Sequence, residues 1–368
     1  MNHRKSLLSA AIFSCLVFGA QAQETSTTPT DLDTVSVVGI RASLEKSLDT
    51  KRNNVTISEA ITAEDIGKFP STNVAEALSQ LPGISLDRRF GQGERVSIDG
   101  TDPSLNLSFL DGHPVAQAIW LYGEQPNRGF DYTLLSPLIL GRMEVIKSSE
   151  ARLTEGSLGG TILMHTRQPL DMRANEVAAS IGYSYSDQAS KGKPNASAIY
   201  SWKNDEETFG INVAAQHYEE RVDRQGMEVF GYAKASTFTN APGVDPNADV
   251  PNSVNAAWFQ QDRKRDSAVV NLQFKPTDEL EFNLSGLYIK ENFDNYNQSM
   301  YSFLTWNPGT IGAVNQLGDV RNGVVNSGHS NASATANSGT VIYDNNVRKS
   351  EVTTKGLDLR GAWTVSYT

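Results

Sequence analysis

Apolar and polar residues alternate along much of the second half of the chain. In the first alternating segment, Val177, Ala179, Ile181, Tyr183 and Tyr185 occupy every second position, and small or polar residues stand between them. A period of two places alternate side chains on opposite faces of a β-strand. The pattern predicts six strands with one apolar face each, at residues 176–186, 196–202, 209–215, 268–274, 280–288 and 357–367.

The connections between these strands vary in length in a regular way. The second and fourth, residues 204–207 and 276–279, are four-residue turns, whereas the first, third and fifth are longer, at residues 187–194, 219–266 and 291–356. Tight turns on one side and long loops on the other are typical of an outer-membrane β-barrel, and Tyr and Trp near strand ends fit its aromatic girdles. A soluble β-sandwich is the alternative, because it shows the same alternation.

The region before residue 170 has a mixed pattern. One face of a short predicted helix carries Val74, Ala77, Leu78 and Leu81. Asn73 is placed to cap this helix with Glu76, and Pro82-Gly83 ends it. Brief apolar runs between Gly, Pro and Asp predict short strands, at residues 84–86, 95–98, 107–110, 143–146 and 161–166. The predicted fold class is an α/β domain followed by antiparallel transmembrane β-barrel strands.

The first residues predict export. Arg4 and Lys5 precede an apolar run from Leu7 to Ala20, and Ala20-Gln-Ala22 follows, as in a signal peptide of residues 1–22 that is cleaved after Ala22. The run is too short for a transmembrane helix. Cys15 is the only cysteine; lipid attachment there is an alternative, but the apolar run continues past it. The mature chain would therefore lack disulfides.

Composition and motifs exclude several classes of function. A formal net charge of −10 on an exported chain argues against binding of nucleic acid. The sequence has no Gly-x-Ser-x-Gly and no His-Glu-x-x-His motif, so we expect no enzyme. Gly91-Gln-Gly93 lacks the rest of a phosphate-binding loop, and His113, His165 and His217 lack metal-ligand spacing. We expect no cofactor and no protein-bound metal.

Six stretches together resemble one protein family. They are DTVSVVG (33–39), ISEAITAEDIGKFPSTNVAEALSQLPGISLDR (57–88), GERVSIDG (93–100), LSFLDGHPV (107–115), ILGRMEVIKSSEA (139–151) and EGSLGGTILMHTRQPL (155–170). In this order they resemble the amino-terminal part of a TonB-dependent outer-membrane receptor, and they are most similar to the subfamily described from Caulobacter and Xanthomonas.

The resemblance implies a division of the chain. Residues 23–52 would hold the TonB box and a linker, residues 53–170 the plug domain, and residues 171–368 the first part of the barrel. The box would be an extended peptide that adds a strand to the carboxy-terminal domain of TonB, which the ExbB/ExbD complex energises. Its residues would be Leu32, Asp33, Thr34, Val35, Ser36, Val37 and Val38. The family barrel has twenty-two strands and sits in the lipid of the Gram-negative outer membrane, so six strands predict a truncated gene product or a partial sequence.

The resemblance also assigns structural roles within the plug. Gly156, Gly159 and Gly160 stand where the family makes a tight turn before its last plug strand. Arg142 matches a plug arginine that pairs with a barrel glutamate in the family; a solvated charge in the lumen is the alternative. Where relatives have Ile-Arg-Gly, this chain has Ile98-Asp99-Gly100, so a second pair of that kind is in doubt.

Aromatic residues and amides suggest the cargo. Sugar rings need aromatic faces for their C–H groups and hydrogen-bond partners for their hydroxyls. The candidate substrate contacts are Trp120, Tyr122 and Phe130 in the plug, and Tyr296, Tyr301 and Trp306 in the fifth connection. We therefore predict uptake of an oligosaccharide. The alternatives are packing roles for these aromatics, a ferric-siderophore cargo, a non-transporting surface adhesin and a secreted glycoside-active enzyme.

Overall fold

The computed structural model describes nine ranges of the chain. They are residues 47–54, 56–62, 73–115, 118–121, 127–237, 244–303, 314–317, 319–330 and 340–365. The predicted signal peptide, the predicted TonB box, Tyr122 and Trp306 lie outside the described residues. Within those ranges, no helix is long and apolar enough to cross a membrane.

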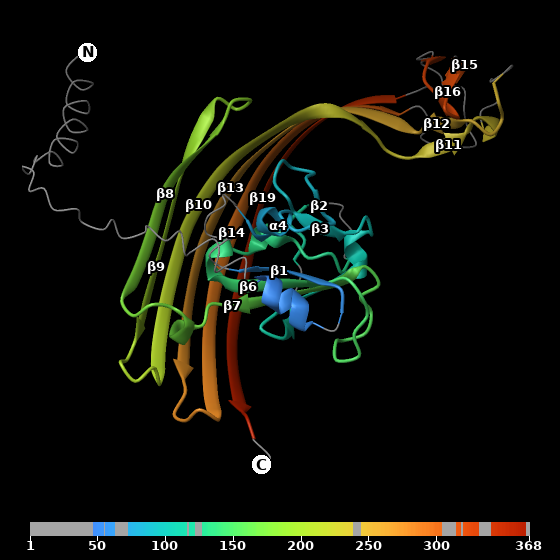
Figure 1. The fold of residues 1–368 in the computed structure, drawn as a ribbon. Coiled ribbons are helices and arrows are strands. Elements are labelled where there is room, and N and C mark those ends of the chain that lie inside the picture. The colour runs from blue at the N-terminus through green and yellow to red at the C-terminus, as the bar shows by residue number, and fades with distance from the viewer. Residues whose placement is uncertain are drawn as a thin grey trace, which may run out of the picture. The chain divides into compact units, whose positions relative to one another are not determined.

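The amino-terminal domain contains a five-stranded sheet in the order β1-β6-β7-β4-β5 (Figure 1). Its strands are β1 (Ser58–Thr62), β6 (Leu140–Ile146), β7 (Gly160–Thr166), β4 (Asn106–Leu110) and β5 (His113–Pro114). Only the β4–β7 pair in this sheet is parallel. A separate hairpin pairs β2 (Ile84–Asp87) with β3 (Arg95–Ile98). The predicted α/β character of this domain is confirmed.

Helix α4 (Val74–Leu78) is short, and its start follows the sequence signal. The Asn73 side chain accepts a hydrogen bond from the backbone N–H of Glu76 at 3.1 Å. The helix ends before Leu81, because the next residues form tighter turns in which the Leu81 N–H donates to the Leu78 carbonyl at 3.0 Å. Gly83 then takes a φ of +74°, a conformation that suits glycine.

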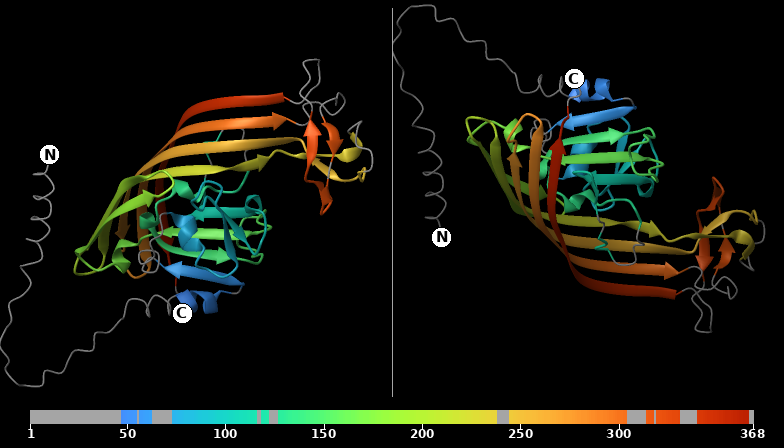
Figure 2. Two further views of the ribbon diagram at one scale, coloured as in Figure 1. Left: turned by 90° about the horizontal axis from the view of Figure 1, so that it is seen from above. Right: turned by 90° about the horizontal axis from the view of Figure 1, so that it is seen from below.

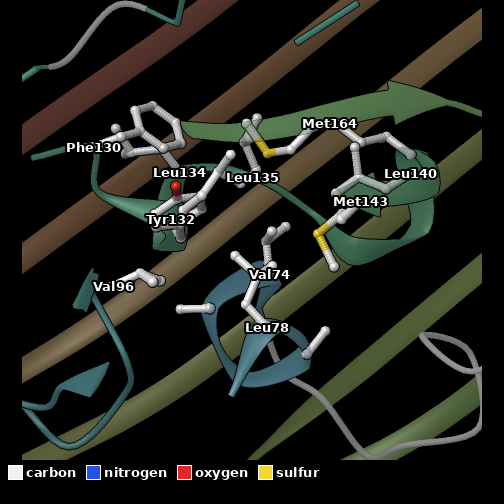
Figure 3. Packing of buried hydrophobic residues seen from close by; sticks show 14 of the residues in the cluster. Val74, Leu78, Val96, Phe130, Tyr132, Leu134, Leu135, Leu140, Met143 and Met164 are labelled. Carbon is white, nitrogen blue, oxygen red and sulfur yellow. The ribbon is translucent and has the colours of Figure 1, made fainter. Parts of the chain in front are cut away.

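The core of this domain packs between helix α4, the sheet and two 3₁₀ turns, Tyr132–Leu134 and Pro137–Ile139 (Figure 3). Two further 3₁₀ turns are Pro103–Leu105 and Pro169–Asp171. Buried core side chains that Figure 3 labels are Val74, Leu78, Val96, Phe130, Tyr132, Leu134, Leu135, Leu140, Met143 and Met164. Burial of these apolar groups stabilises a rigid domain.

The carboxy-terminal part of the chain forms a six-stranded antiparallel sheet in chain order. Its strands are β8 (Glu176–Ser186), β9 (Lys191–Lys203), β10 (Phe209–Val229), β13 (Ser253–Phe274), β14 (Leu280–Phe303) and β19 (Thr340–Trp363). The strands curve together, and the amino-terminal domain lies on the inner side of the curve (Figures 1 and 2). All six predicted strands are present.

The two faces of this sheet have the predicted chemistry. Large apolar side chains on the outer face are exposed, including Ile181 at 91% and Leu357 at 81%. Polar side chains on the inner face bond to one another: Asn271 donates to Asn212 at 2.9 Å, and Ser285 donates to Asn271 at 2.6 Å. An apolar exterior and a polar interior are the arrangement of a membrane β-barrel wall.

The strands extend far beyond the predicted bounds. Residues 219–229 and 253–266 were predicted to lie in a loop, yet they continue β10 and β13 in unbroken register. Charged residues occupy the outer face there, for example Arg221, which pairs with Asp262 at 2.6 Å. Because polar and apolar residues occur on both faces in this part, the alternation of hydrophobicity disappears while the backbone ladder continues. The same correction applies to residues 291–303 and 340–356 of β14 and β19.

Beyond the ends of the long strands, two connections share small sheets. One sheet joins β11 (Tyr232–Lys234), β12 (Asp249–Pro251), β17 (Val324–Val325) and β16 (Val320–Arg321), next to a 3₁₀ turn at Ala235–Thr237. It encloses a small apolar cluster of Ala235, Ala248, Val250 and Val325. A second sheet pairs β15 (Val314–Leu317) with β18 (Gly328–Ser330). The long connections are therefore structured where they are described.

Candidate functional site

A row of aromatic rings joins the amino-terminal domain to the six-stranded sheet. Phe90 lies 4.8 Å from Phe259 of β13 and 5.1 Å from Trp120, measured between ring centroids. Trp120 stacks on Phe293 of β14 with centroids 4.8 Å apart and an interplanar angle of 6°. All four side chains are buried. Aromatic contacts of this kind add to the free energy that area burial supplies, so the row anchors the domain to the sheet.

Asp131 supports the inner end of this row. Its carboxylate accepts hydrogen bonds from the Trp120 indole N–H at 3.2 Å and from the Thr133 backbone N–H at 2.9 Å. The Thr133 hydroxyl donates to it as well, at 2.6 Å. Burial raises the pKa of Asp131, and the bonds from Thr133 oppose that shift. Asp131 therefore fixes the indole while carrying a charge that is costly to bury.

The central ion pair joins Glu94 to Arg263 of β13. Their side chains are 2.8 Å apart, and Arg263 is 2% exposed. The Arg263 guanidinium also lies 5.5 Å from the Trp120 ring centroid and 5.7 Å from that of Phe293. Burial and the nearby charge of Asp131 raise the pKa of Glu94 to about 7, against the opposing effect of Arg263. The carboxyl group of Glu94 is therefore expected to change protonation near neutral pH.

Further polar contacts surround this pair. Arg265 donates to the Thr133 carbonyl and lies 5.1 Å from the Tyr218 ring centroid. Gln92 donates to the Tyr218 hydroxyl at 2.5 Å and to the carboxylate of Glu220. The domain is thus held to three neighbouring strands, β10, β13 and β14, by both polar and aromatic contacts.

A second set of contacts lies at the β4–β5 hairpin and reaches β19. His113 is 2.8 Å from Asp358, and Arg360 is 3.4 Å from Asp111. Asp111 also accepts hydrogen bonds from the backbone and hydroxyl of Thr166, at 3.0 and 2.8 Å. This set fastens the hairpin to the sheet at a place separate from the aromatic row.

Arg142 has an ion-pair partner within the plug. It lies 3.0 Å from Glu144 of its own strand, and its predicted pairing with a barrel glutamate stays a prediction. In two pairs between the domain and the sheet, Glu94–Arg263 and Asp111–Arg360, the arginine is on the sheet and the carboxylate is on the domain. Sequence reasoning missed Glu94 and Arg263, because no local pattern shows that two residues so far apart meet.

The predicted glycines occupy restricted positions. Gly156 and Gly160 have φ values of +107° and +142°, and Gly100 has +80°. A Cβ on Gly160 would lie 2.9 Å from the Ile146 carbonyl oxygen. At Gly159, a Cβ would overlap the Asn106 side chain. Gly159 and Gly160 accept no side chain without a shift of their neighbours, whereas Gly100 has open space around it and is restricted by its positive φ alone.

The predicted substrate aromatics separate into three environments. Trp120 and Phe130 are buried at 3% and 6% exposure, and Phe130 packs edge-on against Tyr132 with centroids 5.0 Å apart. Tyr296 lies on the outer face of β14, where it contacts Trp258 at 6.3 Å. Tyr301 lies on the inner face and contacts Phe230 at 6.0 Å. Of the described candidates, Tyr301 is the one placed for a ligand that enters along the inner face.

The inner face beyond the aromatic row carries a group that we call the mouth face. It comprises Glu228, Phe230, Asn255, Asn297, Ser299 and Tyr301. Asn255 donates to Glu228 at 3.2 Å, and Asn297 donates to Ser299 at 2.9 Å. Phe230 is 50% exposed. Amides, a hydroxyl, a carboxylate, the exposed ring of Phe230 and the half-buried ring of Tyr301 therefore line one continuous part of the sheet.

Among the described residues, no group of three or more His, Cys, Asp or Glu is placed to hold a metal ion.

Comparison with known proteins decides the nature of the amino-terminal domain. Residues 50–161 match the TonB-dependent Receptor Plug Domain. The chain thus combines a plug domain with antiparallel strands that resemble the start of a TonB-dependent barrel.

The solved structures that resemble the chain include three receptors or transporters. The ferric enterobactin receptor PfeA from Pseudomonas aeruginosa is 17% identical, with a TM-score of 0.43, and the match covers 69% of this chain and 39% of that one. The siderophore receptor PirA from Acinetobacter baumannii is 13% identical, with a TM-score of 0.37 and coverages of 69% and 45%. The ferric citrate transporter FecA is 16% identical, with a TM-score of 0.38 and coverages of 70% and 45%. The chain spans less than half the length of each.

Proposed function

We propose that the chain belongs to a transporter that uses TonB to carry an oligosaccharide across the outer membrane. The plug domain seated against a sheet with an apolar exterior and a polar interior supports this proposal most directly. It also favours a transporter over an enzyme. The plug would block the lumen until force from the inner membrane moves it.

The partner of the amino-terminal segment would be the carboxy-terminal domain of TonB, driven by ExbB/ExbD. Leu32 to Val38 alternate in a way that suits a strand added to an exposed sheet edge, where backbone hydrogen bonds supply the affinity. Because proline removes one backbone donor, Val37→Pro should reduce uptake to the level of cells without TonB. Thr27→Pro, outside the box, is the matched control and should transport normally. Equal uptake by the two variants would refute this role for the box.

The mouth face supports the choice of a sugar as cargo. Asn297 and Glu228 offer a donor and acceptors for hydroxyl groups, and the rings of Phe230 and Tyr301 offer faces for C–H groups. The direct test measures uptake of fluorescent oligosaccharides by cells that produce the full-length receptor, with and without TonB. Accumulation that persists without TonB would contradict active transport.

A ferric siderophore is the second candidate cargo, favoured by two cations, Arg89 of the plug and Arg224 of β10. Their guanidinium groups lie 5.5 and 5.4 Å from the ring centroid of Phe90. Guanidinium groups suit an anionic ligand. Uptake of ⁵⁵Fe-loaded siderophores by the same cells would distinguish the two cargoes.

A further inference from the structure

We call the part of the six-stranded sheet that meets the plug the wall, and the contact between the two the joint. At the joint, the charges of the wall alone are balanced. Cross-strand register places Glu220 of β10 opposite Arg263 of β13, and Glu291 of β14 opposite Arg265 of β13. Arg263, Arg265 and Glu291 are each 2% exposed or less. Two guanidinium groups therefore face two carboxylates within the sheet itself.

The plug adds two more carboxylates to this joint. Glu94 and Asp131 are 8% and 5% exposed, and both lie within the electrostatic reach of Arg263. At the edge of the joint, the plug contributes Asp87 of β2 and Arg95 of β3, which have opposite signs. With the plug in place, three buried carboxylates and the half-buried Glu220 share two buried guanidinium groups.

Such an excess of one charge is not stable in a buried site. Carboxylates that share a site cannot all ionise, and an unpaired buried charge costs several kcal/mol. We propose that the plug holds at least one proton on Glu94 or Asp131 while it is seated against the wall, and that loss of this proton loosens the plug. Plug seating is thereby linked to pH, whatever the cargo.

The direction of the linkage follows from Glu94. Its pKa is raised by burial from 4.5 to about 7 in the seated plug. A carboxyl with a raised pKa stabilises the seated state most at low pH, and this contribution decreases as pH rises toward 7 and is lost above it. For one proton and these two pKa values, the equilibrium constant for seating should fall about tenfold between pH 6 and pH 8.

Hydrogen exchange of the full-length receptor in lipid nanodiscs tests the proposal. The protection factors of amides in α4 and β3, corrected for the intrinsic exchange rate, should fall about tenfold from pH 6 to pH 8 in the wild type. Glu94→Gln keeps the shape of the side chain but removes its proton equilibrium, so the pH difference should shrink to less than threefold. Glu59→Gln is the matched control, because Glu59 belongs to β1 and pairs with Lys51 at 2.7 Å; it should keep the wild-type difference.

Two results would overturn the proposal. One is a wild-type receptor whose plug is equally protected at pH 6 and pH 8, which decides the question even where Glu94→Gln fails to assemble. The other is a tenfold difference that survives in both Glu94→Gln and Asp131→Asn. Neither result would bear on whether the cargo is a sugar, because the measurement uses the receptor without ligand.

Discussion

Trp120 shows how much of the joint depends on one side chain. Its ring stacks on Phe293, and its indole N–H donates to Asp131 at 3.2 Å. The guanidinium of Arg263 lies 5.5 Å from the ring centroid. Cations near an aromatic face are attracted to its negative charge. One residue therefore combines apolar burial, a hydrogen bond and a cation contact at the boundary between plug and wall.

Substitution of Trp120 should separate these contributions. Trp120→Phe keeps a stacked ring but leaves Asp131 without one donor, so we expect a loss of about 1 kcal/mol. Trp120→Ala also leaves a cavity and should cost about 3–5 kcal/mol. The free energy of plug opening, from hydrogen exchange of the full-length receptor, measures both. A loss for Trp120→Ala no larger than for Trp120→Phe would show that stacking contributes little.

Gly160 tests the backbone requirement at the start of β7. Gly160→Ala combines a φ of +142° with a Cβ 2.9 Å from the Ile146 carbonyl oxygen, so we expect a loss of about 2 kcal/mol or more. Gly226→Ala in β10 is the control, because no atom lies within 4 Å of its added Cβ. Thermal unfolding of the two variants should differ in midpoint, with Gly160→Ala lower; equal midpoints would contradict the steric argument.

At the scale of elements, the sequence predicts local structure well where one face is apolar. The cap at Asn73, the brief plug strands and the register of the lipid-facing segments all depend on neighbours along the chain. The sequence pattern did not predict the extensions of β10, β13, β14 and β19 beyond their apolar segments. The charges in these extensions are satisfied across strands, as in Lys290–Glu351 at 2.9 Å. Pairing of that kind depends on residues distant in sequence and has no signature in a single segment.

Strand β8 offers a direct test of which face meets lipid. Ile181 is 91% exposed on the apolar face, whereas Ser180 beside it bonds to Ser197 at 2.7 Å on the other face. A lysine on the lipid face near the bilayer midplane costs about 2–4 kcal/mol. Ile181→Lys should therefore lower the yield of folded, heat-modifiable receptor in outer-membrane fractions, and Ser180→Lys should not. Equal yields would argue for a soluble sandwich.

At the scale of the whole molecule, the mouth face combines residues from three strands that only the folded sheet brings together. Neither Phe230 nor Glu228 was a candidate from sequence, and among the described candidates only Tyr301 belongs to this face. The aromatic composition of the fifth connection suggested a ligand-binding role, which stays a prediction. It could not show which side of the sheet each ring faces, because the side depends on where each strand begins and ends, and the sequence pattern did not predict those positions.

Ligand binding should depend on this face. Phe230→Ala removes half-exposed ring surface beside Tyr301 and should weaken binding of the proposed oligosaccharide cargo about tenfold, which corresponds to about 1.4 kcal/mol. Tyr343→Ala is the control, because Tyr343 is 78% exposed and opposite Met300 on the outer face. Isothermal titration of the full-length receptors compares them. Unchanged affinity in Phe230→Ala would remove the mouth face from the binding site.

The length of the strands has a consequence for what reaches the protein from outside the cell. β14 has 24 residues, which extend to about 80 Å at 3.3 Å per residue, and the apolar outer positions occupy only its first part, Leu280 to Tyr288. A bilayer fitted to that band would leave the remainder of the strand standing above the lipid, even with a tilt of about 45°. Antibodies and bacteriophages would then meet a tall protein rim, and small changes on its charged exterior could alter their attachment without disturbing transport.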